Sequence, residues 1–218
     1  MASPHARIEQ LLAEGGRYDV EVLPQLEACL KQQLKDNTYS LEANLAMLKL
    51  YLLYPEHTNV ESLEKVLLKA LMAFPATDFY LCLYQIPEKY HANLKSIMDL
   101  AQQLEMAKFK TFWKDSADVS VLSVAIGWES AIRKFIAGVV SSTYRSIKAD
   151  QLRELLNLEK GKLDAYIEES GWSRSKTEKD IVIVSEATFQ EPVRVEPKPS
   201  TNMTLDQYRT LFMAASSA

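Results

Sequence analysis

The 218-residue sequence has few of the side chains that metal and disulfide chemistry require, with two cysteines and three histidines. Cys29 and Cys82 each lie inside an apolar helical pattern, so we expect buried free thiols rather than a disulfide bridge. His5, His57 and His91 have no histidine, cysteine or carboxylate partner at ligand spacing. We therefore expect no metal site and no cofactor.

Glycine, basic charge and long hydrophobic runs are scarce as well. Six glycines are few for this length, which disfavours a loop-rich or all-β fold. The net charge is −4, whereas nucleic-acid binders usually carry a basic surplus because neutralising phosphates supplies much of their affinity. No apolar stretch approaches the roughly 20 residues that span a bilayer, and the first residues lack the apolar run of a secretory signal. We expect a cytoplasmic protein, with a nuclear fraction as an alternative.

Arrangements typical of enzymes are missing too. The sequence has no glycine-rich phosphate loop and no nucleophile elbow. Its carboxylates are scattered over the faces that the helical patterns leave for solvent. We therefore predict no catalytic residues and a protein that is not an enzyme.

Residues 1–127 consist of eight helical patterns joined by short connections, the last at Val119–Ile126. The pattern from Ser40 to Tyr54 is apolar on most faces, which indicates a helix buried among others, and Ser40 is a suitable N-cap. The next pattern opens with Thr58–Glu61, which we interpret as a capping box. Successive helices without a strand signal predict a stacked, HEAT-like helical repeat domain.

Residues 128–186 have the element order of a winged helix, which makes the fold mainly α with a small β-sheet. A long helix over 128–144 is followed by two compact helical patterns at 150–157 and 159–169. The β-branched run Ile181–Val184 then predicts a strand. The sequence therefore predicts a helical stack that runs into a winged helix.

Two features of this second domain bear on its packing. Arg145–Lys148 is interpreted as a short break between helices. The long helix before it carries one dense apolar stripe, which we expect to serve the core of the stack and the core of the winged helix at once. The stripe consists of Ala131, Ile132, Phe135, Ile136, Val139 and Val140.

The charge of the winged helix disfavours DNA reading. Its third helix occupies the place of a recognition helix, yet residues 159–169 carry two positive charges against four negative ones. That is the wrong sign for a groove lined by phosphates, so we favour a winged helix that docks on protein. Arg145, Lys148 and Arg153 are a weaker candidate RNA contact, with a solvated face as the alternative.

Residues 187–218 predict an extended linker and a short helix. Three prolines lie between Glu191 and Ser200, which favours an extended chain. Thr204–Gln207 is a second capping box. A helix of roughly ten residues is marginal alone in water, so it must fold back on its own domain or dock on another subunit. Its apolar residues recur at helical spacing: Leu205, Tyr208, Leu211 and Phe212.

Several segments, in the right order, resemble a known family. A helical stack running into a winged helix is the layout of the PCI domain, which scaffold subunits of the proteasome lid, the signalosome and eukaryotic translation initiation factor three share. Over about Val22 to Val184 the chain resembles more closely the subunit K family of initiation factor three. The matching segments are Thr38–Tyr51, Leu67–Leu71, Pro75–Phe79 with Leu81-Cys82, Phe112-Trp113, Arg133–Ile136 with Thr143-Tyr144, and Gly171-Trp172.

The resemblance implies a non-catalytic scaffold subunit of initiation factor three that supports small-ribosomal-subunit binding and messenger recruitment through protein contacts. The implied partners are the other subunits, subunit L foremost, and the small ribosomal subunit through the complex. In such assemblies winged helices associate edge to edge and C-terminal helices gather into a bundle. This analogy makes the strand residues Ile181 and Ile183, with the apolar residues of the C-terminal helix, candidate protein-binding residues.

Two alternatives stay open at this point. One is a winged-helix adaptor that binds RNA or DNA, which predicts binding by the isolated chain that weakens steeply with salt. The other is a scaffold subunit of a different PCI assembly, such as the proteasome lid or the signalosome. The partners, rather than the composition, distinguish these possibilities.

Overall fold

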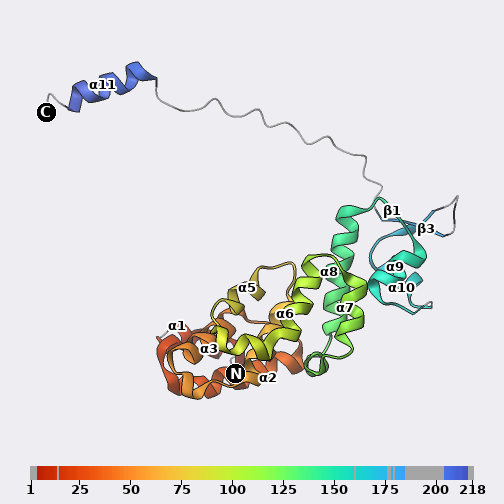
Figure 1. The fold of residues 1–218 in the computed structure, drawn as a ribbon, viewed down its shortest axis with the longest axis horizontal. Coiled ribbons are helices and arrows are strands. Elements are labelled where there is room, and N and C mark those ends of the chain that lie inside the picture. Colours follow the sequence, from red (N-terminus) through yellow and green to blue (C-terminus); the bar gives the residue numbers. More distant parts are fainter. Residues whose placement is uncertain are drawn as a thin grey trace. The chain divides into compact units, whose positions relative to one another are not determined.

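The computed structural model describes residues 4–13, 15–159, 161–175, 178, 180–184 and 204–215. Within these residues it contains a series of helices and one three-stranded sheet (Figure 1). This arrangement confirms the predicted mainly α fold with a small sheet. The chain divides into two units, Met1–Ser185 and Glu186–Ala218. The domain boundary that we expect at residues 127 and 128 lies inside the first unit and stays a prediction.

The helical stack occupies the first half of the first unit. Its α-helices are joined by short 3-10 turns, as the alternation of apolar stripes and breaks predicts. The α-helices are α1 (Pro4–Ala13), α2 (Leu23–Asp36), α3 (Leu41–Leu53), α4 (Val60–Met72), α5 (Asp78–Leu83), α6 (His91–Glu105) and α7 (Phe109–Ser116). The 3-10 turns are η1 (Gly16–Tyr18), η2 (Val20–Val22), η3 (Pro55–His57), η4 (Glu88–Tyr90) and η5 (Ser120–Val124).

Helix α4 lies in the middle of the core of the stack. It contacts α2, α5 and α6, and its apolar stripe is almost completely shielded from water. Fully burying a side chain of this kind contributes about 1.5–3 kcal/mol each to folding. The stripe consists of Leu63, Val66, Leu67, Ala70 and Leu71, each at most 1% exposed.

A small polar network lies within this apolar core, at the junction of α2 and α3. The Gln33 amide donates to Asn44 Oδ1 over 3.1 Å, and the backbone N–H of Ser40 donates to Gln33 Oε1 over 3.1 Å. Gln33 and Asn44 are 3% and 1% exposed, so each needs a partner inside the protein. Their mutual hydrogen bonds explain how an asparagine is accommodated in an otherwise apolar helix.

The first residues of α3 and α4 test the predicted N-caps. Ser40 caps α3, because its Oγ accepts from the Ala43 N–H over 3.4 Å, which confirms the prediction. The predicted capping box at Thr58 is wrong: the cap of α4 is Asn59, whose Oδ1 accepts from the Glu61 N–H over 3.0 Å. The Thr58 hydroxyl instead donates to the Tyr51 carbonyl over 3.2 Å. The Thr58 hydroxyl therefore binds a carbonyl near the end of α3, although the sequence pattern predicts it as the cap of α4.

The eighth helical pattern of the stack, Val119–Ile126, is also interpreted wrongly. Its residues form the 3-10 turn η5 rather than an α-helix, and Leu122 is the buried residue of that turn. The backbone N–H of Ile126 donates to the Leu34 carbonyl at the end of α2 over 3.3 Å. The segment is therefore a connection that leads the chain back across the stack to the winged helix.

The winged helix has two more strands than its sequence predicts. Its elements are α8 (Trp128–Thr143), β1 (Ser146–Lys148), α9 (Ala149–Leu156), α10 (Leu163–Glu169), β2 (Ser173–Arg174) and β3 (Ile181–Ile183). The strands are antiparallel, in the order β1-β3-β2. The break predicted at Arg145–Lys148 is thus mostly strand. The second compact helix begins at Leu163 rather than Glu159, after a turn at Gly161 and Lys162.

The apolar stripe of α8 divides into two rows in the structure. Ile132, Ile136 and Val140 are at most 1% exposed, whereas Ala131, Phe135 and Val139 are only partly buried. The core therefore covers one row completely and the other in part, since Phe135 and Val139 still pack against it. Residues three positions apart point about 60° away from each other around a helix, so one row lies deeper in the core than the other.

The second unit contains α11 (Leu205–Ala215). Its predicted capping box is confirmed: the Thr204 N–H donates to Gln207 Oε1 over 2.8 Å, and the Gln207 N–H donates to Thr204 Oγ1 over 3.4 Å. Leu205, Tyr208 and Phe212 are exposed, whereas the Leu211 side chain and the proline-rich linker lie outside the described residues. None of the described helices combines the length and the apolar character that crossing a bilayer needs.

Candidate protein-interaction site

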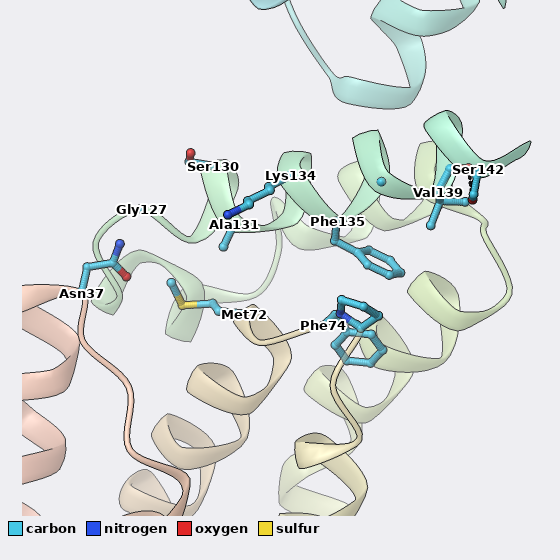
Figure 2. Close-up of a pocket in the computed structure, with 12 residues that line it drawn as sticks. Asn37, Met72, Phe74, Gly127, Ser130, Ala131, Lys134, Phe135, Val139 and Ser142 are labelled. Atoms are coloured by element: carbon cyan, nitrogen blue, oxygen red, sulfur yellow. Dashed lines mark hydrogen bonds between the residues drawn. The ribbon is translucent and has the colours of Figure 1, made fainter. Parts of the chain in front are cut away.

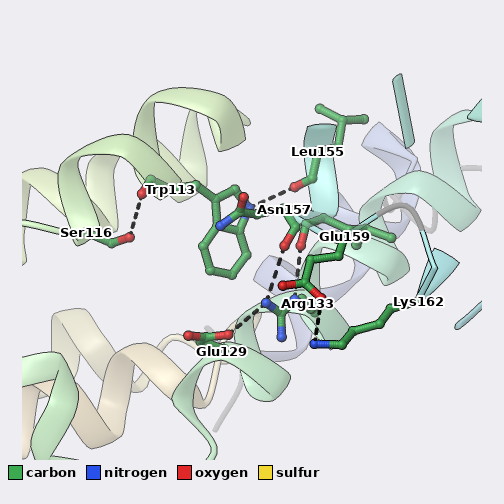
Figure 3. Close-up of polar contacts among 9 residues, drawn as sticks. Trp113, Ser116, Glu129, Arg133, Leu155, Asn157, Glu159 and Lys162 are labelled. Carbon is green, nitrogen blue, oxygen red and sulfur yellow. Dashed lines mark hydrogen bonds and ion pairs between the residues drawn. The ribbon is translucent and has the colours of Figure 1, made fainter. Parts of the chain in front are cut away.

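Side chains of α7 and α8 bind backbone carbonyls at the end of α9 and so join the stack to the winged helix (Figure 3). Trp113 Nε1 donates to the Leu155 carbonyl over 2.9 Å, and Arg133 Nε donates to the Leu156 carbonyl over 3.0 Å. Arg133 Nη2 also lies 3.4 Å from the Asn157 carbonyl. These carbonyls lie at the C-terminal end of α9 and have no hydrogen-bond partners within that helix. The negative end of the helix dipole lies there as well. A cation there fixes α9 against α8.

Arg133 is held in place by its own neighbours. Its Nη2 forms an ion pair with Glu129 Oε2 at 2.7 Å, one helical turn earlier. The guanidinium lies 5.4 Å from the centroid of the Trp113 ring, a distance at which a cation is attracted to an aromatic face. The Tyr166 hydroxyl donates to the Arg133 backbone carbonyl over 3.2 Å. Both sides of the joint therefore contact the same arginine, which the sequence showed only as part of a segment resembling the family.

A groove with a volume of about 850 Å³ lies between α8 and the end of α4 (Figure 2). Residues of α8 from Ser130 to Ser142 form one wall, and the end of α4 with the residues that follow it forms the other. Sequence patterns did not indicate this groove, because its walls are far apart in the chain. The lining residues are Asn37, Met72, Phe74, Pro75, Gly127, Ser130, Ala131, Lys134, Phe135, Gly138, Val139 and Ser142.

One end of the groove is polar and cationic. Asn37 and Lys134 lie at that end in Figure 2, whereas Phe74 and Phe135 lie in the middle. Asn37 Oδ1 accepts a long, 3.5 Å hydrogen bond from Nζ of Lys69, a lysine that is only 3% exposed. Burial lowers the pKa of the Lys69 ammonium, because taking a charge out of water disfavours the charged form.

The structure changes the interpretation of the predicted docking strand. Strand β3, with Ile181 and Ile183, is the central strand and is paired on both sides, so it offers no open edge. An open edge of β3 therefore cannot be the means by which this strand docks on a partner. Ile181 and Ile183 are partly buried, and their role in protein binding stays a prediction. The open edges of this sheet, within the described residues, belong to β1 and β2.

The backbone of β1 shows which groups its open edge presents. The Val184 N–H donates to the Arg145 carbonyl over 2.9 Å, and the Ala149 N–H donates to the Asp180 carbonyl over 2.8 Å. Because backbone groups alternate in direction along a strand, odd-numbered residues face β3. The N–H groups of Ser146 and Lys148 therefore face the open edge.

The candidate RNA contact is spread over a strand and a helix. Arg145 and Lys148 are exposed at β1, while Arg153 lies on α9 and forms an ion pair with Asp150 at 3.3 Å. The nearby Arg174 of β2 likewise pairs with Asp164 of α10 at 2.6 Å. Two of the basic groups of the winged helix are thus already next to a carboxylate. An RNA contact through Arg145, Lys148 and Arg153 stays a prediction.

The side chains with strongly shifted pKa values belong to the core. Cys29 and Cys82 are free and buried, which confirms the expectation for both, and burial raises the pKa of the Cys82 thiol to about 12. Burial also raises the pKa of the Tyr39 hydroxyl, which donates to Asp78 Oδ2 over 2.9 Å. Among the described residues, no group of three or more histidine, cysteine, aspartate or glutamate side chains could hold a metal ion.

Comparison with known proteins gives consistent matches over most of the chain. Residues 57–192, from η3 through the winged helix, match the model of the CSN8/PSMD8/EIF3K family. The chain is 38% identical over 182 residues to eukaryotic translation initiation factor 3 subunit K of Drosophila persimilis, covering 82% of this chain and 81% of that one. The proteins of the same name from Drosophila erecta and Drosophila mojavensis are 39% identical over 169 residues and 37% identical over 182 residues, covering 76% and 82% of this chain and 76% and 81% of theirs.

Proposed function

The chain belongs to the CSN8/PSMD8/EIF3K family, and on that premise we propose that it is a non-catalytic scaffold subunit of eukaryotic translation initiation factor three. One observation carries the proposal: relatives named as subunit K of that factor match about four-fifths of this chain and of their own length. Its partners are the other subunits of the factor, subunit L foremost. Through the complex it supports binding to the small ribosomal subunit and messenger recruitment, in the cytoplasm.

In this role the helical stack and the winged helix present binding surfaces to the partner subunits. The two domains are held at a fixed angle to each other. The contacts of Trp113 and Arg133 with the end of α9 support that arrangement. The open edge of β1 is the docking strand, and α11 docks through Leu205, Tyr208, Leu211 and Phe212. An exposed, amphipathic helix of 11 residues gains most of its stability from a surface on which it packs.

A nuclease-treated pull-down from the cytosol of the source organism tests the proposal. The tagged chain is recovered with its bound proteins, which are identified by mass spectrometry. Recovery of the other subunits of initiation factor three, with subunit L among them, is the expected outcome. Recovery of proteasome-lid or signalosome subunits instead would be compatible with the fold but would overturn the assignment to initiation factor three. Loss of all partners after nuclease treatment would favour a nucleic-acid adaptor.

Two substitutions at one residue separate edge docking from nucleic-acid binding. Lys148 has a φ of −69°, which proline adopts without strain. Lys148→Pro removes an N–H from the open edge and leaves the hydrogen bonds to β3 intact, so we expect it to reduce recovery of the partner subunits. Lys148→Ala removes the same charge but keeps the N–H, and we expect normal recovery. Equal losses in both variants would show that the charge matters and the edge does not.

Deletion of residues 204–218 tests the role of the C-terminal helix. We expect fewer subunits to be recovered in the same pull-down, while the circular dichroism of the remaining helices is unchanged. A matched variant, Tyr208→Ser with Phe212→Ser, removes two exposed apolar side chains without shortening the chain. Undiminished recovery of every subunit with both variants would rule out this helix as a docking element.

A further inference from the structure

We propose that the groove beside α8 is a docking site for a helical segment of a partner protein that presents an apolar row with a carboxylate at one end. Docking here uses other residues than the edge of β1 and α11. The chemistry of the groove is also the same whichever complex the chain enters. A test of this docking site can therefore fail while the assignment to initiation factor three holds, and the reverse is also true.

The dimensions of the groove suit about three turns of helix. Its lining residues on α8 run from Ser130 to Ser142, a rise of about 18 Å at 1.5 Å per residue. The α8 wall of the groove is low between Ser130 and Ser142, because small side chains alternate there with larger ones. A Cβ atom placed at Gly138 would meet no atom within 4 Å, so the middle of the groove is open to a second helix. Amphipathic helices commonly bind in grooves of this kind.

The apolar floor is fixed before anything binds. The Phe74 and Phe135 rings are 5.5 Å apart in an edge-to-face arrangement, and Phe109 packs edge-on against Phe135 at 6.2 Å. Phe74 also contacts the buried Phe79 at 6.2 Å. Aromatic rings in this geometry stabilise one another beyond their area burial. Because the rings are already ordered, an apolar side chain that packs against them orders little else, which favours binding.

The charge at one end of the groove selects an acidic ligand. Lys134 lines the groove and has no ion-pair partner among the described residues. Asn37 leaves its amide N–H group for a ligand, since its carbonyl oxygen accepts from Lys69. No aspartate or glutamate lines the groove. In a chain with a net charge of −4, this end is a local cationic site.

Lys69 adds a second, independent reason for an acidic ligand. Its ammonium is buried and has one neutral partner at 3.5 Å among the described residues. A buried charge is costly unless it is paired and hydrogen-bonded. A carboxylate bound by Asn37 and Lys134 would lie near this ammonium and favour its charged form. The apolar floor and the cationic end together specify the sequence of the segment, with apolar residues at helical spacing and aspartate or glutamate at one end.

Selection of peptides on the immobilised full chain tests the proposal. The probe is a display library of random peptides of about 12 residues, which corresponds to roughly three helical turns. The binders are synthesised, and their dissociation constants are measured by fluorescence anisotropy. We expect a consensus with apolar residues three or four positions apart and one terminal aspartate or glutamate. Replacing that acid by its amide is expected to weaken binding about tenfold, as for one partly desolvated charge pair.

Matched variants locate the binding site. Lys134→Glu reverses the charge in the groove and is expected to weaken binding by at least about tenfold. The same change at Lys95, an exposed lysine of α6 outside the groove, is expected to have little effect. Ser142→Trp fills the apolar end of the groove, whereas Ser141→Trp adds the same side chain to the neighbouring position, which does not line it. Only the first of these two is expected to reduce affinity.

Three outcomes would overturn the proposal. The first is a consensus without an acidic residue. The second is a set of binders that Lys134→Glu and Lys95→Glu affect equally, which would place them elsewhere on the chain. The third is displacement of the binders by a peptide with the sequence of residues 204–215, which would assign the groove to the chain's own C-terminal helix. Circular dichroism of each variant checks that a loss of affinity is not a loss of fold.

Discussion

Helix α4 buries eight of its 13 residues, whereas α8 buries three of its 16. The first is surrounded by α2, α5 and α6, so its residues contribute to the core on almost every side. The second packs through Ile132, Ile136 and Val140 and leaves a second apolar row beside the groove. The part of this row that the fold leaves uncovered is available to a partner. The comparison therefore separates residues of α4 that stabilise the fold from residues of α8 that line the proposed docking groove.

The largest effect should come from the core of α4. Leu67 is 0% exposed, so Leu67→Ala leaves a cavity and is expected to lower the free energy of unfolding by about 3–5 kcal/mol. Urea denaturation followed by circular dichroism measures this change. Leu53→Ala, at a leucine that is 50% exposed, is the control and should cost less than about 0.5 kcal/mol. Similar losses at both positions would remove the distinction between the two kinds of helix surface.

The joint between α7 and α9 should show a smaller, local effect. Trp113→Phe keeps the aromatic packing but removes the donor to the Leu155 carbonyl, so we expect a loss of about 1–2 kcal/mol. Hydrogen exchange should become faster in α9 while the amides of α4 keep their protection. Trp128→Phe is the control, because Trp128 packs against Trp113 at 5.9 Å and no hydrogen bond joins its indole to the described residues. Equal changes in both variants would point to packing rather than to the hydrogen bond.

Lys69 is the exception within α4, and its replacement should increase stability. Lys69→Met removes a buried charge with one neutral partner, so we expect a gain of about 1–2 kcal/mol near neutral pH. The folded-state pKa of Lys69 lies below its ordinary value of 10.5. Between these two values the unfolded state binds more protons, so the contribution of Lys69 to stability improves as the pH rises.

The pH dependence distinguishes this explanation from a simple packing effect. The advantage of Lys69→Met over the natural chain should shrink as the pH is raised through about 10.5, because Lys69 becomes neutral in both states only above its ordinary pKa. Thermal unfolding of the two chains across this pH range measures the difference. Lys65→Met, one helical turn earlier at a lysine paired with Glu61 at 3.2 Å, is the control. A constant advantage at every pH would show that the charge of Lys69 is not the cause.

The smallest effect should come from α11, which has no buried residue among those described. Thr204→Ala removes the side-chain oxygen that accepts from the Gln207 N–H, and we expect the helix to lose about 0.5–1 kcal/mol. Exchange of the Gln207 amide in the full chain measures this loss. Thr204→Ser keeps the acceptor and should change little. An unchanged exchange rate in Thr204→Ala would mean that packing, and not the cap, maintains this helix.

Local sequence patterns account for most helices and for several details of their ends. The Ser40 cap and the Thr204–Gln207 box were predictable because a cap depends on residues within one helical turn. The predicted cap at Thr58 failed because the Tyr51 carbonyl, on the preceding helix, accepts from the same hydroxyl. A local pattern cannot reveal such a competitor, since that contact exists only after α3 and the following turn are in place.

The candidate site was less predictable than the fold. Strand β1 contains Ser146, Ile147 and Lys148, too short and too polar to indicate a strand by propensity. It is a strand because Ile147 pairs with Val182 of β3. The same pairing places β3 in the centre and removes its open edge. The open edge therefore belongs to a strand that the sequence did not indicate, and docking through it stays a proposal.

The sequence by itself determined the mainly α architecture, the order of its helices, the buried thiols and the winged-helix layout. Hydrophobic periodicity and capping residues act within one or two turns, so they can be read along the chain. The tertiary structure alone decided which row of α8 is covered and which strand has an open edge. It also brought Asn37, Phe74 and Phe135 into one groove. These properties depend on contacts between residues distant in sequence, and such contacts form only when the helices pack.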